Sequence, residues 1–277
     1  MRAKILLTTV LGLALACQPA PESPAAEAPA AQQRPVDTVF IEEMTWTEIR
    51  AAIDSGKTTL IIPTAGTEQN GPHMVMGKHR YIIEMAADRI ARQLGNALVA
   101  PTVTYVPEGN IDPPSGHMRY AGSITVPNDV FMSIVEWGAR SGAVHGFTDI
   151  ALIGDSGGNQ RGMEEVANML NAEWGGSPAR LHFIPDYYSA NGFGEWVMAQ
   201  GEPEEAVGSH AGILDTSLLM YVNSDHIRMD KLAPLGGGEG SGVSGDPTRA
   251  SVERGEQGME MRVDVAVKQI REKIAAN

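Results

Sequence analysis

The sequence has a single cysteine, Cys17, among its 277 residues. This excludes a disulfide framework within the chain and any zinc site built from several cysteine thiolates. Basic residues are also scarce, because Lys and Arg number 21 against 34 Asp and Glu, and the formal net charge is -13. A nucleic-acid surface needs clustered Lys and Arg, so this balance argues against nucleic acid as a partner.

The sequence begins with an apolar stretch at residues 5–16, which is shorter than the roughly 20 residues that span a bilayer. It follows Arg2 and Lys4 and ends in Ala14-Leu15-Ala16, a pattern typical of a secretory signal peptide and its cleavage site. We therefore expect residues 1–16 to be a signal peptide. Cys17 comes next, in a context that resembles the lipobox of bacterial lipoproteins.

The N-terminal pattern predicts export from the cytoplasm. The protein is expected to be a periplasmic or outer-membrane lipoprotein of a bacterium, attached to the membrane only through a lipid on Cys17. The alternative is a secreted soluble protein that is cut at the same bond. Residues 18–35 contain eleven Pro or Ala among 18 residues. Such a segment cannot bury enough apolar surface to fold, so residues 17–36 are expected to be a tether.

The rest of the chain, residues 37–277, is expected to be one domain in which strands and helices alternate. Short apolar runs rich in β-branched residues predict strands at residues 59–63, 97–106, 149–154 and 179–184. A capping box at residues 45–48 and helical spacing elsewhere predict helices at residues 45–54, 81–94, 128–141, 162–174 and 253–276. Residues 210–223 are expected to begin as a loop and continue as a helix. This order predicts an α/β fold with a mostly parallel central sheet and helices on both faces.

Two polar segments follow predicted strands, residues 64–79 and residues 154–160. In parallel sheets, ligands bind outside the carboxyl ends of the strands. Four side chains there have the nitrogen and oxygen donors that suit Zn, Mn or Fe: Glu68, His73, His79 and Asp155. The alternative is that these residues are polar groups that cap helices and hold loops.

Two further groups have catalytic potential. Gly157 and Gly158 lie between a predicted strand and a predicted helix, so their backbone N–H groups could face an anion, although a tight turn also requires glycine there. His210 comes just before a predicted helix and could be a general base, a metal ligand or a loop residue. Asp215 could orient His210 or cap that helix.

Five ordered boxes resemble the creatininase (creatinine amidohydrolase) family. These boxes are Glu68-Gln-Asn-Gly-Pro-His73, Tyr120-Ala-Gly-Ser-Ile124, Gly157-Gly-Asn159, His210-Ala-Gly-x-x-Asp-Thr-Ser217 and Gly242-Val-Ser-Gly-Asp-Pro247. The resemblance covers the whole domain. It implies an α/β fold, a metal-dependent hydrolase of a C–N bond in a small or cyclic amide, two bound divalent ions, and assembly as a homo-oligomer, often a hexamer.

The sequence departs from the family at the metal ligands. Glu68 matches the family pattern, but the first-box histidine is replaced by Asn70 and the aspartate shared by both ions is replaced by His79. The loop histidine is replaced by Ser156, and the acidic position after it is Gly158. A neutral imidazole has one free lone pair and cannot bridge two cations, so we do not expect the two-ion site.

A site for one divalent ion, Zn, Mn or Fe, is expected instead, with Glu68, His79 and Asp155 as its ligands and one open position for water. In this interpretation the ion activates the water and His210 acts as the acid and base. Gly157 and Gly158 stabilise the oxyanion, and Asn70 holds the substrate carbonyl.

The resulting hypothesis is an exported, metal-dependent hydrolase of a small, cyclic amide or of a related lactone. One alternative is a catalytically inactive binding protein with this fold, because three family ligands are replaced by Asn70, His79 and Ser156. Another is a metal-independent hydrolase that uses His210 with Asp215 and a serine nucleophile, Ser156 or Ser209. The sequence around Ser156 only approaches the G-x-S-x-G pattern.

Overall fold

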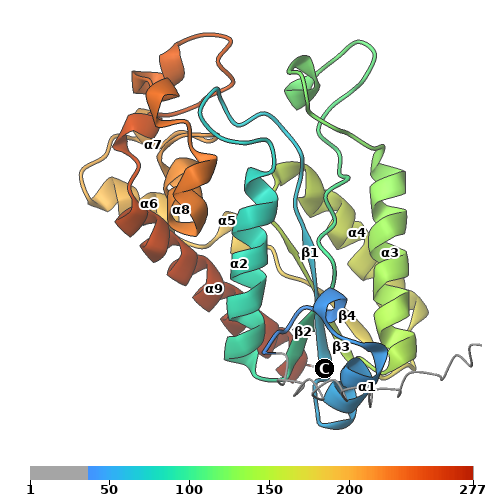
Figure 1. The fold of residues 1–277 in the computed structure, drawn as a ribbon. Helices are drawn as coiled ribbons and strands as arrows, with labels where there is room; N and C mark the ends of the chain where they lie inside the picture. The colour runs from blue at the N-terminus through green and yellow to red at the C-terminus, as the bar shows by residue number, and fades with distance from the viewer. Residues whose placement is uncertain (1–36, 277) are drawn as a thin grey trace, which may run out of the picture. The chain divides into compact units, whose positions relative to one another are not determined.

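The computed structural model describes residues 37–276 (Figure 1). The predicted signal peptide, Cys17 and the tether all lie outside the described residues. Within residues 37–276, the helices are too short or too polar to cross a membrane.

Four parallel strands form the central sheet, in the order β2-β1-β3-β4. They are β1 (Thr59–Thr64), β2 (Ala97–Val99), β3 (Asp149–Gly154) and β4 (Arg180–Phe183). Every residue of β1 is buried, as expected of a parallel strand that is covered on both faces. The predicted parallel sheet is therefore confirmed.

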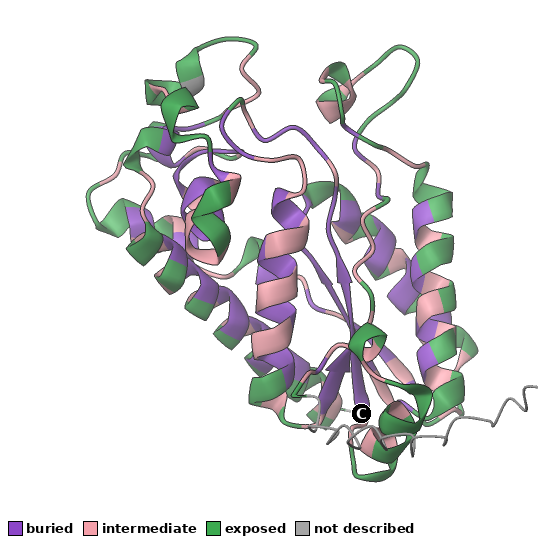
Figure 2. Cartoon of the chain, in the orientation of Figure 1, coloured by how far each residue is buried: buried purple, intermediate pink, exposed green. Residues whose placement is uncertain are grey.

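Helices cover both faces of this sheet, as the sequence predicts (Figures 1 and 2). The helices are α1 (Trp46–Asp54), α2 (Lys78–Leu94), α3 (Asn128–His145), α4 (Gly157–Glu173), α5 (Asp186–Ser189), α6 (Phe193–Ala199), α7 (Glu204–Val207), α8 (Ile213–Asn223) and α9 (Val252–Ala275). The predicted capping box at the start of α1 is present, with reciprocal bonds between Thr45 and Glu48. Between β2 and α3, a long loop contains one short 3-10 helix, η2 (Gly116–Arg119).

The side chains of the strands divide the core into two layers. Alternate residues of β1 point to opposite faces, so Ile61 packs with helices α2, α8 and α9, while Leu60 and Ile62 pack with α3 and α4. This alternation follows from the two-residue period of a strand. Both layers are apolar, which leaves the polar groups of the interior at the ends of the strands.

Some boundaries differ from the predicted ones for local reasons. β2 ends at Val99 rather than near residue 106, because Pro101 lacks the N–H that a ladder needs, and the chain then touches β1 only at Val103. α4 begins at Gly157, five residues before the predicted start, because glycines with low helix propensity hide its first turn. The helices α5, α6 and α7 are too short to leave a periodic signal in the sequence.

The strand order determines where a ligand site can form. From β1 the chain crosses to β2 on one side and then to β3 on the other, so the connections after β1 and β3 leave the sheet in opposite directions. This is the switch point at which open α/β sheets hold ligands. In Figure 1 the loops of residues 65–77, 107–126 and 228–250 rise above this end of the sheet.

Candidate active site

A cavity of about 560 Å³ lies at the carboxyl ends of β1 and β3. Its walls come from the loops after both strands, from η2, from the starts of α2, α4 and α8, and from α9. The polar side chains that line it are Glu68, Lys78, His79, Glu108, His117, Asp155, Ser156, Tyr188, Ser209, His210, Asp215 and Arg262.

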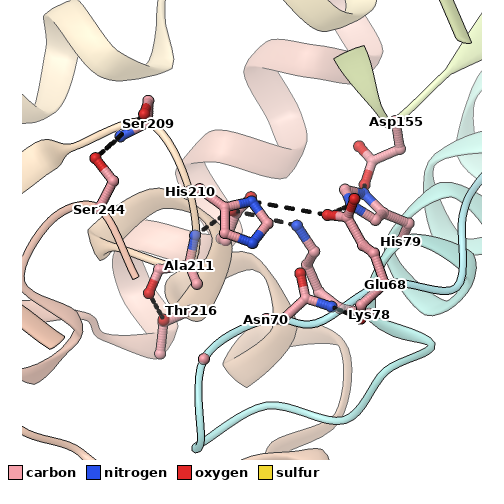
Figure 3. Close-up of polar contacts among 12 residues, drawn as sticks. Glu68, Asn70, Lys78, His79, Asp155, Ser209, His210, Ala211, Thr216 and Ser244 are labelled. Atoms are coloured by element: carbon pink, nitrogen blue, oxygen red, sulfur yellow. Dashed lines mark hydrogen bonds and ion pairs between the residues drawn. The ribbon is translucent and has the colours of Figure 1, made fainter. Parts of the chain in front are cut away.

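A row of alternating charges forms the floor of the cavity (Figure 3). The His79 ring donates from Nε2 to Glu68 Oε1 at 2.7 Å and from Nδ1 to Asp155 Oδ2 at 2.8 Å. The other oxygen of Asp155 accepts from Arg262 at 2.5 Å and from the Tyr187 hydroxyl at 3.2 Å. α9 therefore completes a site whose other members follow β1 and β3.

The charges in this row stabilise one another. Burial opposes the charged form of Glu68, but His79 and Lys78 outweigh it and hold the pKa of this carboxyl well below its usual range. Burial and the Lys78 charge oppose a charged His79 ring, but Glu68 and Asp155 outweigh both and raise the pKa of this imidazole. His79 is thus a protonated ring between two carboxylates.

A second buried pair joins Lys78 to Asp215. Lys78 is 1% exposed, and its Nζ lies 3.2 Å from Asp215 Oδ2. Burial disfavours the Asp215 anion, but Lys78 and His210 hold the pKa of Asp215 well below its usual range. Asp215 also accepts from the Ala211 N–H at 2.8 Å. Within residues 37–276 it makes no hydrogen bond to His210 and does not cap α8, so its contacts hold the loop before this helix instead.

Two further imidazoles approach Glu68 from the other side. His117 Nε2 lies 3.2 Å from Glu68 Oε2, and His210 Nδ1 lies 3.7 Å from Glu68 Oε1. The two rings are tilted, with their centroids 4.7 Å apart. Burial lowers the pKa of both imidazoles, so both are neutral near pH 7.

Glu108 is a carboxyl group adjacent to Glu68. Burial and the Glu68 charge raise the pKa of Glu108 to about 10, so Glu108 keeps its proton.

Hydrogen-bond donors gather where α4 begins. Gly157 and Gly158 are its first residues and line the cavity, and the Ser156 side chain before them does not cap the helix. Their N–H groups therefore remain available to a ligand. The Tyr188 hydroxyl lies beside them, since a Cβ added at Gly157 would be 3.1 Å from this oxygen. Burial and the nearby carboxylates raise the pKa of Tyr188 to about 12, so it stays a donor.

Other predicted residues lie away from the cavity wall. Asn70 is fully buried, and its amide donates to the Glu68 main-chain oxygen at 2.9 Å, so it shapes the loop that carries Glu68. His73 contacts Thr216 Oγ1 at 3.0 Å, which fits the alternative that this side chain holds a loop. Ser156 and Ser209 do line the cavity, but within residues 37–276 neither is hydrogen-bonded to a histidine, so the geometry does not favour the serine alternative.

The structure brings the predicted ligands Glu68, His79 and Asp155 into contact, but as a hydrogen-bonded row. Both His79 nitrogens donate to carboxylates, so this ring has no lone pair for an ion while the row is intact.

Glu68, His117 and His210 offer a second set of candidate ligands, whose ligand atoms all lie within 4.8 Å of one another. One carboxylate with two neutral imidazoles is a known zinc set with an open position, so these residues fit a divalent ion.

Several members of the site were not identified from the sequence. Lys78 lies next to His79 in the chain, so its position inside a polar segment was the one available signal. Glu108, Tyr188 and Arg262 lie in a loop, a short helix and the last helix, without a motif around them. Only the fold brings them to this cavity.

Comparisons with known proteins identify the family of the chain. The family model "Creatininase: Creatinine amidohydrolase" matches residues 42–270. A mycofactocin precursor peptide peptidase of Mycolicibacterium smegmatis is 26% identical over 221 residues, covering 72% of this chain and 78% of that protein. A creatinine amidohydrolase of Pseudomonas putida is 25% identical over 205 residues, covering 70% of this chain and 76% of that protein.

Solved creatininase structures share the fold. The structure named "Creatininase Mn" superposes with a TM-score of 0.73 at 22% identity, covering 85% of this chain and 98% of that chain. A creatininase variant described as "Zn-Zn type" gives a TM-score of 0.69 over the same shares. The matches confirm the family, the fold class and the enzyme class expected from the sequence. The chain belongs to the creatininase family and is an enzyme of that family's class, the metal-dependent amidohydrolases.

Proposed function

We propose that this protein is an exported hydrolase that cleaves a C–N bond in a small amide, with one divalent ion at Glu68, His117 and His210. A cyclic amide is the first substrate class to test, and a related lactone the second. The observation that carries the proposal is the ionised Glu68 carboxylate facing two neutral imidazoles at the wall of a cavity.

The separation of the ligand atoms supports an ion at this point. Glu68 Oε1 and His210 Nδ1 are both acceptors, and they face each other at 3.7 Å. This separation would suit two ligand atoms of one divalent ion, which Glu68, His117 and His210 would hold. A divalent ion there supplies a Lewis acid and lowers the pKa of a bound water toward ~7.

The residues of the chain supply the other requirements of amide hydrolysis. The N–H groups of Gly157 and Gly158, with the Tyr188 hydroxyl, are donors for the carbonyl oxygen as it gains negative charge. Asn70, which the sequence suggested for this task, is buried under the loop instead. The protonated His79 ring lies between the Glu68 and Asp155 carboxylates. The charges on the floor of the site are therefore set before substrate enters.

His210 has two possible roles that use the same atom. Its Nε2 donates to the Gln69 main-chain oxygen at 2.9 Å, which leaves the Nδ1 lone pair for the cavity. One lone pair either binds an ion or accepts a proton. The acid and base role expected from the sequence is therefore the alternative to the ligand role proposed here.

The size of the cavity favours a compact substrate. About 560 Å³ is within the range of roughly 300–1,000 Å³ that small-molecule sites occupy. The named relatives act on creatinine and on a precursor peptide, so the end of a peptide is the next substrate class to examine.

The test combines metal analysis with hydrolysis of an amide, lactam and peptide panel. The purified protein should hold about one ion per chain and lose activity with a chelator. Glu68→Gln should lose the ion and lower kcat/KM by more than the 10–100-fold of an outer-shell change. His182→Asn, on a distant histidine, is the matched control. Full activity in ion-free protein would contradict the proposal.

His210→Ala separates the two roles of His210. Loss of both ion and activity supports the ligand role, whereas an inactive variant that keeps its ion supports the acid and base role. A chain that binds no ion under any loading and hydrolyses nothing in the panel would favour the inactive binding protein. That alternative is motivated by His79, which uses both ring nitrogens on carboxylates.

Export and assembly are proposed on the sequence and the family resemblance. We infer a lipid on Cys17 in the bacterial envelope and a homo-oligomer, with the hexamer as the first state to test. Cell fractionation with Cys17→Ala tests the first inference, since the variant should leave the membrane fraction. Light scattering on a chain that begins at residue 37 tests the second, and a monomer would contradict it.

A further inference from the structure

Gln69 contacts both imidazoles of the proposed ion site. It follows Glu68 directly and is 7% exposed. Its Nε2 lies 3.1 Å from His210 Nε2 and 3.3 Å from His117 Nδ1. The same nitrogen donates to the main-chain oxygen of Gly242 at 3.0 Å. One amide therefore joins three separate loops around the ion site.

The orientation of this amide is fixed by backbone groups. Gln69 Oε1 accepts from the Gly71 N–H at 2.9 Å, while Nε2 donates to Gly242. Turning the amide over would place its N–H groups against the Gly71 N–H and its oxygen against the Gly242 oxygen. Gly242 packs against the amide, because a Cβ there would lie 2.1 Å from Gln69 Oε1. The Nε2 atom must therefore face the two imidazoles.

The partners of His210 determine which of its nitrogens carries the proton. His210 Nε2 lies 2.9 Å from the Gln69 main-chain oxygen, which can only accept. The proton is therefore on Nε2, and the Nδ1 lone pair faces Glu68. His210 is prepared to bind an ion without any change.

His117 is in the opposite situation. One Gln69 amide hydrogen goes to Gly242, and His210 Nε2 is itself a donor, so the second amide hydrogen goes to His117 Nδ1. The proton of this neutral ring is then on Nε2, which donates to Glu68 Oε2. To bind an ion through Nε2, the ring must move its proton to Nδ1, where it would meet the Gln69 amide hydrogen.

We propose that Gln69 is a positioning residue that makes the two imidazoles unequal and lowers the affinity of the site for a divalent ion. It leaves His210 ready as a ligand and holds His117 as a hydrogen-bond donor to Glu68. The inference rests on the proposed ion site. Outer-shell partners of ligating histidines commonly change metal affinity by about 10–100-fold, and most of them accept the ring N–H, whereas Gln69 donates to the ring.

Two substitutions test this effect, with Zn²⁺ alone as the probe in competition titrations. Gln69→Glu offers an acceptor to His117 Nδ1–H and should tighten Zn²⁺ binding by about 10–100-fold. Gln69→Met keeps the length of the side chain but has no donor, so it should bind more tightly than the wild type and less tightly than Gln69→Glu. Because Met is neutral, an increase in Gln69→Met is not a charge effect. Tightest binding by the wild type, or equal binding by all three, would overturn the proposal.

A measurement on ion-free protein separates this proposal from the ion site itself. Long-range ¹H–¹⁵N spectra distinguish the two neutral tautomers of a histidine. In the wild type, His117 and His210 should both carry the proton on Nε2. In Gln69→Glu, His117 Nδ1 should carry a proton that donates to the new carboxylate, while His210 is unchanged. A wild-type His117 with its proton on Nδ1 would contradict the assignment, even if the chain binds no ion.

Discussion

Strand β3 has an aspartate–histidine contact at each of its ends, and the two contacts differ in their surroundings. At the amino end, Asp149 accepts from His182 Nε2 at 2.9 Å. Just past the carboxyl end, Asp155 accepts from His79 Nδ1 at 2.8 Å. The distances are nearly equal, so distance alone does not identify a functional site.

The two ends of β3 differ in the number of charged groups around the aspartate–histidine contact. His182 has one carboxylate partner, whereas His79 lies between two, and Asp155 also contacts Arg262. In a buried setting each added charge changes the protonation of its neighbours. The carboxyl end thus has a fixed pattern of several charges, and the amino end has one local pair.

Removing a charge should have the largest effect at the carboxyl end. Arg262→Met leaves the buried Asp155 short of a cation and should lower the free energy of unfolding by about 3–5 kcal/mol. His182→Asn should cost about 1–2 kcal/mol. Urea unfolding of both variants measures the difference. Equal losses would mean that the two ends are energetically alike. The double variant with Asp155→Asn and Arg262→Met should recover part of the stability that Arg262→Met loses.

The two ends should also differ in their response to pH. Glu108 in the unfolded chain loses its proton near its ordinary pKa of about 4.3, whereas in the fold it keeps the proton to about pH 10. The folded chain binds the extra proton between these values, so this group's stabilising contribution falls as pH rises, by at most about 1.4 kcal/mol per pH unit. Glu108→Gln removes this loss, so its stability relative to the wild type should increase from pH 5 to pH 9.

Asp149→Asn is the matched comparison for the pH experiment. His182 and Thr148 outweigh burial and hold the pKa of Asp149 below its usual range. Its stabilising contribution is therefore complete above the unfolded pKa and is lost only as the pH falls below it. Between pH 5 and pH 9, the stability difference between Asp149→Asn and the wild type should therefore change less than that of Glu108→Gln. A Glu108→Gln difference that changes as little would contradict the protonated state of Glu108.

The smallest expected effect on activity and stability comes from adding one methyl group near each end of β3. Gly157→Ala places a Cβ 3.1 Å from the Tyr188 hydroxyl and should raise KM a few-fold through this displaced donor. Its stability should change by less than about 1 kcal/mol, because alanine is the better helix former. Gly176→Ala, in the loop before β4, meets open space and should change neither quantity. An unchanged KM in Gly157→Ala would remove Tyr188 from the proposed donor group.

The sequence predicted the sheet and its covering helices well, because buried parallel strands such as residues 149–154 are short apolar runs that need no knowledge of their neighbours. It also placed Glu68, His79 and Asp155 at one end of the sheet. It did not predict that His79 would be protonated between the two carboxylates, because that state depends on contacts with Glu68 and Asp155 that outweigh burial and the Lys78 charge. The roles of His117 and Gln69 depend on a contact between residues more than 40 positions apart in the chain. A single sequence does not show which distant residues come into contact.

The position of Arg262 on α9 has a consequence for the order of synthesis. The strands and loops that carry Glu68, His79 and Asp155 leave the ribosome well before Val252–Ala275. Until that last helix emerges, Asp155 lacks its guanidinium and the apolar layer that α9 covers is open. A nascent chain can pair its strands early, but it completes the charge pattern of the site only after α9 has emerged.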